Sequence, residues 1–147
     1  MRRFIRLILI ALSLVIFGTF GMLVKNYEFE AGESALKAGD YSAALIKLKS
    51  LASLGDHRSQ FLVGQMYAFG FGVPKDDATA IYWFRKAAIL AELGADPAAP
   101  AELSVSKSYS QGLGVKADAK ESLKWLQRAA SGGSKEAALQ LQQIEGH

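Results

Sequence analysis

The feature that most constrains this chain is a stretch of 25 residues that occurs twice. Gly64–Ala88 reads GQMYAFGFGVPKDDATAIYWFRKAA, and 42 residues later Ser106–Ala130 reads SKSYSQGLGVKADAKESLKWLQRAA. The copies align without a gap and share eight identical residues: Tyr67/Tyr109, Gly70/Gly112, Gly72/Gly114, Val73/Val115, Asp76/Asp118, Trp83/Trp125, Ala87/Ala129 and Ala88/Ala130. Self-similarity at a fixed period of this size indicates one structural unit that is repeated along the chain.

Each copy is predicted to form two helices joined by a glycine turn, an αα-hairpin. In the first copy, residues 60–68 are apolar at helical spacing. Gly70 and Gly72 then break the helix, because glycine adopts the positive φ angles that a reversal requires. Pro74 and Asp76 prepare the next helix, since proline suits the approach to a helix and aspartate caps its free N–H groups.

The second helix of each copy carries an apolar stripe. In the second copy Asp118 and Glu121 resemble a capping box at the start of this helix. Trp83 and Trp125 supply bulk, and we expect both indole rings in the core of the repeat instead of on a surface that stacks sugars. In the first copy the spacing of three and four residues places five side chains on one face: Ala80, Ile81, Phe84, Ala87 and Ala88.

These motifs resemble the Sel1-like repeat, a family related to the tetratricopeptide repeats. The resemblance rests on the Gly-x-Gly-Val turn and on the spacing from Trp to Ala-Ala, and it extends over roughly residues 30–145. Ser59 stands where the family usually has Ala, and Ser106 stands where it usually has Gly. The resemblance implies an all-α fold, a short right-handed solenoid of αα-hairpins. The matching residues of the first unit are Gly55, Ser59, Gln60, Val63, Gly64, Tyr67, Gly70, Gly72, Val73, Asp76, Ala80, Trp83, Ala87 and Ala88.

The chain is expected to divide into an N-terminal segment, a stack of hairpins and a cap. The segments are a transmembrane anchor at 1–25, a partial tetratricopeptide-like hairpin at 26–54, Sel1-like repeats at 55–90 and 101–132, and a capping helix at 133–147. A cap is expected because each repeat buries its face only against its neighbours. Gly94, Pro97 and Pro100 make residues 91–100 a loop between the repeats, which is either a partner contact or a tolerated surface excursion.

The N-terminal segment is apolar and begins with basic residues. Arg2, Arg3 and Arg6 precede Leu7–Val24, a run of 18 residues without a charge. As a helix this run would measure about 27 Å, close to the roughly 30 Å hydrocarbon core of a bilayer. A cleaved signal peptide is the alternative, although its apolar core is usually shorter. The arginines favour a cytoplasmic N-terminus. We therefore expect a single-pass inner-membrane protein with its repeats in the periplasm or otherwise outside the cytoplasm.

The composition argues against several classes of protein. The chain has no cysteine, so neither a disulfide framework nor a thiolate metal site is available. The three leading arginines account for the net charge of +3, and the other 14 Lys and Arg residues balance the 14 Asp and Glu residues. The repeats therefore have no basic surplus that would suggest nucleic acid as a partner. Two histidines and scattered carboxylates do not form a metal-binding set, and no cofactor is expected.

Two short motifs imitate functional sites. Asp56, His57 and Ser59 have the residue types of a catalytic triad, but residues this close on one helical turn rarely face one another in the required geometry. We interpret His57 as an exposed residue at a helix start. Gly70–Lys75 faintly resembles a phosphate-binding loop, yet it follows a helix and recurs as the turn of the second copy. We therefore expect no catalytic, cofactor or metal site.

The resemblance implies a non-catalytic scaffold or adaptor for protein–protein interactions, here anchored in the bacterial cell envelope. The first helices of successive hairpins would line a concave side, on which we select Gln65, Phe69, Lys107 and Gln111 as candidate partner-binding residues. The aromatic rings of Phe69 and its neighbour Phe71 are replaced in the second copy, so the repeat does not require them; they either contact a partner or pack.

The expected partners are envelope proteins, or a second copy of the chain, because little more than two units is near the minimum for a stable stack. Two alternative functions are open from the sequence. The protein is then either a small periplasmic regulator of a cell-wall or secretion enzyme, or an envelope hydrolase.

Overall fold

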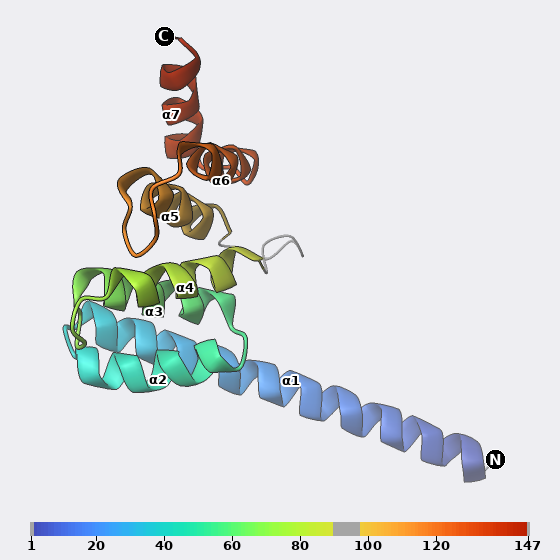
Figure 1. Ribbon diagram of the computed structural model, residues 1–147. Helices are drawn as coiled ribbons and strands as arrows, with labels where there is room; N and C mark the ends of the chain where they lie inside the picture. The colour runs from blue at the N-terminus through green and yellow to red at the C-terminus, as the bar shows by residue number, and fades with distance from the viewer. Residues whose placement is uncertain (1, 90–97, 147) are drawn as a thin grey trace.

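The computed structural model describes residues 2–89 and 98–146, together with the side chains of these residues except at positions 2–11, 14, 17 and 98. All regular structure in these ranges is α-helical, which confirms the predicted all-α fold (Figure 1). The helices are α1 (Arg2–Lys37), α2 (Tyr41–Ser53), α3 (His57–Phe69), α4 (Asp77–Ile89), α5 (Ala98–Gln111), α6 (Ala119–Ser131) and α7 (Lys135–Glu145).

The helices stack in chain order. The C-terminal part of α1 pairs with α2, α3 pairs with α4, and α5 pairs with α6, while α7 covers α6 (Figure 1). Each helix packs chiefly against the helices that precede and follow it in the chain. This is the quasi-one-dimensional arrangement of a solenoid, in which a repeat buries its apolar face only against its neighbours.

The two glycine turns fold in the same way. Gly70 ends α3 in the left-handed conformation with φ 74°, and Gly72, Gly112 and Gly114 also have positive φ. In both turns the capping aspartate closes back on the first helix: Asp76 N–H donates to the Tyr67 carbonyl, and Asp118 N–H donates to the Tyr109 carbonyl, each at 2.9 Å.

The second glycine of each turn touches the preceding hairpin. A Cβ added to Gly72 would lie 2.7 Å from Cβ of Tyr41, at the start of α2. A Cβ added to Gly114 would lie 2.2 Å from the backbone oxygen of Asp77, at the start of α4. The turn therefore requires glycine for close packing between units as well as for its φ angle.

Both tryptophans lie in the seams between hairpins, as predicted. Trp83, on α4, is 8% exposed and belongs to a core cluster with Leu48 of α2 and Met66 of α3. Trp125, on α6, is half-buried and packs against the alanine pair Ala87 and Ala88 of α4. Each indole thus reaches the preceding unit, so the seams couple neighbouring hairpins.

Within each hairpin, one small residue of the first helix faces a larger residue of the second. A Cβ added to Gly64 would lie 2.6 Å from the Phe84 ring. A Cβ added to Gly32 would lie 2.9 Å from the Leu48 side chain. In the third hairpin the contact is polar: Ser106 Oγ donates to the Ser122 carbonyl at 2.8 Å, and Ser122 Oγ donates to the Ser106 carbonyl at 3.0 Å. This exchange explains why Ser106 is accommodated where the family usually has Gly.

Two local expectations differ from the structure. Helix α5 begins at Ala98, so Pro100 lies in its first turn and not in a loop; proline is tolerated there because the first N–H groups of a helix have no intrahelical acceptor. Residues 90–97 of the expected loop lie outside the described residues. The capping box is only half formed, because Asp118 N–H is bound to Tyr109 and Glu121 pairs with Lys124 instead.

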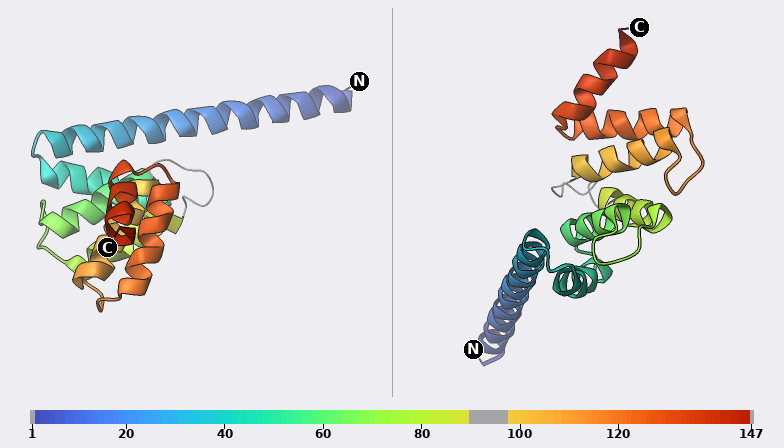
Figure 2. Two further views of the ribbon diagram at one scale, coloured as in Figure 1. Left: turned by 90° about the horizontal axis from the view of Figure 1, so that it is seen from above. Right: turned by 90° about the vertical axis from the view of Figure 1, so that its left-hand side faces the viewer.

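Helix α1 is one continuous helix of 36 residues, and its N-terminal part extends away from the stack (Figure 2). Among the described residues, no helix meets the length and apolarity that crossing a bilayer requires, so the expected anchor over Leu7–Val24 is not supported. Within that run, the side chains at positions 7–11, 14 and 17 lie outside the described part of the chain.

Candidate functional site

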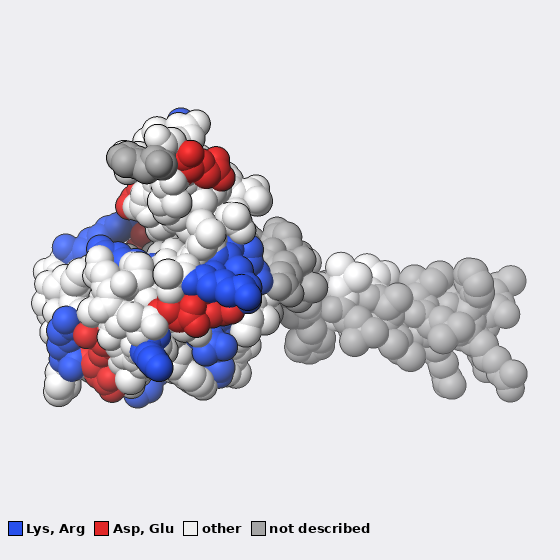
Figure 3. All heavy atoms as spheres, turned by 45° about the horizontal axis from the view of Figure 1, so that its top comes forward, with Lys and Arg blue, Asp and Glu red and all other residues white. Residues whose placement is uncertain are grey.

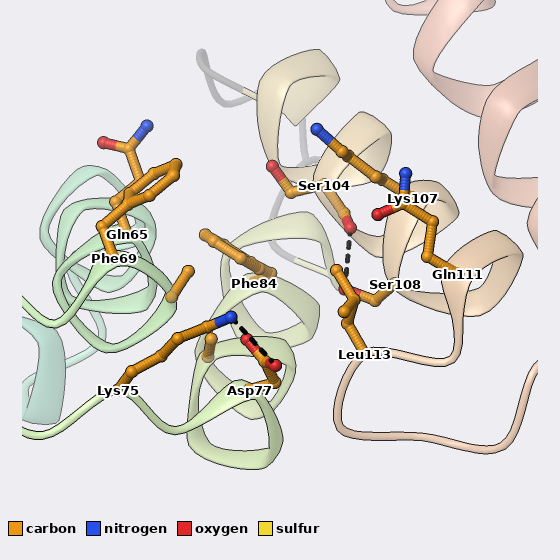
Figure 4. Close-up of a pocket in the computed structure, with 12 residues that line it drawn as sticks. Gln65, Phe69, Lys75, Asp77, Phe84, Ser104, Lys107, Ser108, Gln111 and Leu113 are labelled. Atoms are coloured by element: carbon orange, nitrogen blue, oxygen red, sulfur yellow. Dashed lines mark hydrogen bonds and ion pairs between the residues drawn. The ribbon is translucent and has the colours of Figure 1, made fainter.

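An open pocket of about 390 Å³ lies where α3, α4 and α5 meet (Figure 4). The four residues selected from the sequence all line it, Gln65 and Phe69 from α3 and Lys107 and Gln111 from α5. They come from the first helices of two successive hairpins, and α4 contacts both of these helices. The other lining residues are Ala68, Lys75, Asp77, Ala80, Phe84, Ser104, Ser108 and Leu113.

The base of the pocket is apolar. Phe84 and Ala80, both on α4, are buried and line it between the two first helices (Figure 4). Phe69 stands at the edge and is 65% exposed, whereas Phe84 is 6% exposed. An apolar base with polar groups around it is the usual construction of a binding pocket.

The exposed ring of Phe69 is held by a row of aromatic side chains. The Phe69 ring centroid lies 5.6 Å from that of Phe71, and the Phe71 centroid lies 5.0 Å from that of Tyr41, with an interplanar angle of 8° in the second pair. Phe71 therefore packs on the preceding hairpin, while Phe69 remains at the pocket with its orientation supported from behind. Offset stacking at these distances is favourable for aromatic pairs.

Some of the polar groups around the pocket already have a hydrogen-bond or ion-pair partner within the described part of the protein, and others do not. Lys75 Nζ lies 3.4 Å from Asp77 Oδ2, and Ser108 Oγ donates to the Ser104 carbonyl at 3.0 Å (Figure 4). Lys107 is exposed and forms no ion pair with any side chain that the structure describes. On the face drawn in Figure 3, basic and acidic side chains are interspersed over the stack.

A second hollow of about 230 Å³ lies on the other side of α5, against α6 and α7. Lys107 and Gln111 line both hollows, so they stand on the ridge that α5 forms between them. Glu136 and Gln140 of α7 and Leu126 of α6 contribute to the second hollow. The two hollows make one interrupted groove across the first helices of the stack.

The triad-like residues do not form a catalytic arrangement. Ser59 Oγ donates directly to Asp56 Oδ1 at 2.9 Å, with no imidazole between hydroxyl and carboxylate. Asp56 is the N-cap of α3 and also accepts from the Ser59 N–H at 2.9 Å. Burial raises the pKa of Asp56, but these hydrogen bonds and the cations of Lys25 and Arg58 outweigh it, so its pKa lies below the ordinary value. The carboxylate therefore stabilises the helix start as a charged cap.

Within the described part of the chain, no three His, Cys, Asp or Glu residues lie close enough together to hold a metal ion. The Gly70–Lys75 segment is the reversal between α3 and α4, as its twin is between α5 and α6. The glycines of this segment serve the turn, and Lys75 at its end is the residue of the motif that lines the pocket.

Sequence reasoning missed part of the pocket. Phe84 was assigned to the core stripe and Lys75 to the turn, and both assignments describe their local context correctly. Leu113, the counterpart of Phe71, also lines the pocket from the turn after α5. No sequence pattern marks these residues, because they meet only when two hairpins stack.

Comparison with known proteins identifies the repeats. The family model of the Sel1 repeat matches residues 57–91 and 99–134. A solved Sel1 repeat protein from Oxalobacter formigenes is 31% identical with a TM-score of 0.69, and the match covers 82% of this chain and 34% of that one. No curated protein matches the chain.

Two further solved structures show the fold alone, because their identity is below a quarter. A protective antigen present in uropathogenic Escherichia coli strains, displaying an SLR fold, has 24% identity and a TM-score of 0.70 over 82% of this chain and 25% of the antigen. The Helicobacter pylori cysteine rich protein B has 23% identity and a TM-score of 0.60, and the match covers 66% of this chain and 68% of that protein. The chain thus spans about a third of the Oxalobacter protein and a quarter of the antigen.

Proposed function

We propose, from the premise that this chain is a Sel1-repeat protein, that it is a non-catalytic scaffold that holds partner proteins in the groove across α3 and α5. One observation carries the proposal: side chains from the first helices of two successive repeats, Phe69 and Lys107 among them, line a single open pocket with an apolar base. Repeat stacks commonly bind partners along extended surfaces of this kind.

The size and openness of the pocket suit a protein segment. At about 390 Å³ the pocket lies near the lower end of the range for small-molecule sites. It is also open, so a ligand in it remains in contact with solvent. A peptide chain that crosses the groove would place one side chain in the pocket and continue over the α5 ridge. The amides of Gln65 and Gln111 can both donate and accept hydrogen bonds, as a peptide backbone requires.

The partners are proposed to be proteins of the cell envelope, with the chain held at the inner membrane through Leu7–Val24. Support for this location comes from the uncharged run and the three arginines before it. The described apolar side chains of this run, including Val15, Ile16 and Phe20, are exposed on a helix that leaves the stack. Such a surface needs an apolar environment to cover it.

Site-specific photocrosslinking in intact cells tests the scaffold role. A benzophenone amino acid replaces Phe69 at the pocket or, as the matched control, Ile46, which is 71% exposed on α2 and lines neither of the two hollows. We expect position 69 to give one or a few discrete adducts with envelope proteins and position 46 to give none of them. Adducts that are the same at both positions, or the absence of any adduct at position 69, would contradict the proposal.

A further inference from the structure

One positive charge in the groove, that of Lys107, has no ion-pair partner among the described side chains. Of the two carboxylates that line the hollows, Asp77 is paired with Lys75 at 3.4 Å, and Glu136 accepts a hydrogen bond from the neutral amide of Gln140 at 3.4 Å. Lys107 stands between the hollows, and no carboxylate among the described side chains pairs with it. A partner that supplies a carboxylate here would gain an ion pair without breaking an existing one.

An apolar side chain has a prepared place beside this charge. Phe84 closes the pocket from below, and Phe69 lines it as an exposed ring held by Phe71 and Tyr41. Because stacking already restricts the Phe69 ring, the Phe69 side chain loses less conformational entropy when a ligand packs on it. Rigid aromatic side chains in a desolvated pocket are the residues that most often dominate interface energies.

We propose, building on the scaffold function above, that the groove binds an acidic protein segment with an aromatic or large aliphatic side chain as its anchor. The anchor enters the pocket against Phe84 and Phe69, and a neighbouring Asp or Glu of the segment pairs with Lys107. A basic segment is disfavoured, because it would bring cations to Lys75 and Lys107 while Asp77 is already occupied. The charge pair supplies register and the anchor supplies most of the affinity.

Peptide selection tests this chemistry directly. The full chain is purified in mild detergent, immobilised and used to select from a phage library of random dodecapeptides. We expect enriched sequences that place Asp or Glu next to Phe, Trp, Tyr or Leu. Enrichment of basic or uncharged sequences, or no enrichment over an unrelated protein, would overturn the proposal.

The strongest selected peptide is then synthesised with a fluorophore, and its binding is measured by anisotropy. Lys107→Glu is expected to weaken binding about tenfold, and the peptide with Gln in place of its acidic residue should lose about as much. The two changes should not add, because both remove the same ion pair. Lys116→Glu is the matched control, since Lys116 is exposed in the turn after α5 and lines neither hollow; it should leave binding unchanged. Equal losses from Lys116→Glu and Lys107→Glu would show that only net charge matters and would refute the proposed pair.

Two further measurements separate the possible failures. A single-stranded oligonucleotide that binds as tightly as the peptide and competes with it would mean that the groove binds polyanions and not an anchored acidic segment. If position 69 crosslinks a cellular protein but the selected peptides lack acidic residues, the partner chemistry is wrong while the scaffold function stands. If acidic, anchored peptides bind and no cellular protein crosslinks, the chemistry stands and the scaffold function fails.

Discussion

At the scale of single residues, the two glycines of each turn have different tasks. Gly112 and Gly114 have the same φ of 69°, yet their surroundings differ. An added Cβ at Gly112 would meet its nearest neighbour, Ala117 Cβ, at 3.6 Å, an ordinary contact, whereas at Gly114 it would lie 2.2 Å from the Asp77 oxygen. The first glycine serves the turn, and the second also serves the packing of one repeat on another.

Gly114→Ala is therefore expected to destabilise the protein more than Gly112→Ala. The left-handed φ alone costs a non-glycine residue about 1–2 kcal/mol, and Gly112→Ala should lose this amount. Gly114→Ala adds a clash with backbone atoms that cannot rotate away. Its loss in free energy of unfolding should therefore exceed that of Gly112→Ala by about 1 kcal/mol. Urea unfolding of the two variants measures the difference. Equal losses would show that the seam between the repeats tolerates the extra methyl group.

At the scale of elements, α1 is joined to α3 by polar contacts around Asp56. The Asp56 carboxylate is 3% exposed, and its Oδ2 lies 3.4 Å from Lys25 Nζ of α1 and 3.8 Å from Arg58 Nη2. Arg58 in turn donates to Asn26 Oδ1 at 3.0 Å and lies over the Phe29 ring at 4.1 Å. The long helix is thus fixed to the repeats immediately after its apolar run.

This junction predicts acid sensitivity. Burial raises the pKa of Asp56, but the hydrogen bonds from Ser59 and the nearby cations together lower it by more than burial raises it. The folded-state pKa therefore lies below the ordinary value of 3.8. The unfolded chain therefore binds the proton more readily. The contribution of this carboxylate to stability is fully present above pH 3.8 or thereabouts and is lost as the pH falls through the folded-state pKa.

Asp56→Asn tests this contribution. Asparagine still caps a helix, so at pH 7 the variant should lose only the charge interactions, about 1–2 kcal/mol. Thermal unfolding at pH 7 and in steps below pH 4 is the measurement. We expect the difference in melting temperature between the wild type and the variant to decrease as the solution becomes more acidic. A difference that stays constant would mean that the carboxylate is not linked to folding through its proton.

At the scale of the whole molecule, the location proposed for the chain has a direct test, because the chain has no cysteine and single cysteines can be introduced one at a time. Leu54→Cys, at a site that is 77% exposed between α2 and α3, should react with a membrane-impermeant maleimide in intact spheroplasts. Arg3→Cys should react only after the membrane is permeabilised, because the basic flank favours the cytoplasmic side. Ala88→Cys, at a fully buried site, serves as the control and should react only after denaturation. Reaction of both Leu54→Cys and Arg3→Cys in intact spheroplasts, or of neither, would contradict the proposed orientation.

The sequence by itself determined the repeating unit. Local preferences were sufficient for this: positive-φ glycines end helices, aspartates cap them, and stripes at helical spacing with Trp83 and Trp125 mark the faces that pack. The same reasoning brought Gln65, Phe69, Lys107 and Gln111 to one surface, because equivalent positions of equivalent helices face the same way. Gly32 escaped notice because the first hairpin has a different turn.

Only the tertiary structure decided what surrounds those four residues. Phe84 is a core residue by its own stripe and becomes the base of a pocket only when α5 stacks on α4. Phe69 has a supported orientation only because Phe71 reaches Tyr41 of another hairpin. Among the described side chains Lys107 has no ion-pair partner, and the nearby Asp77 is paired with Lys75 instead. Such contacts join residues that are distant in sequence, and periodicity within one helix carries no information about them.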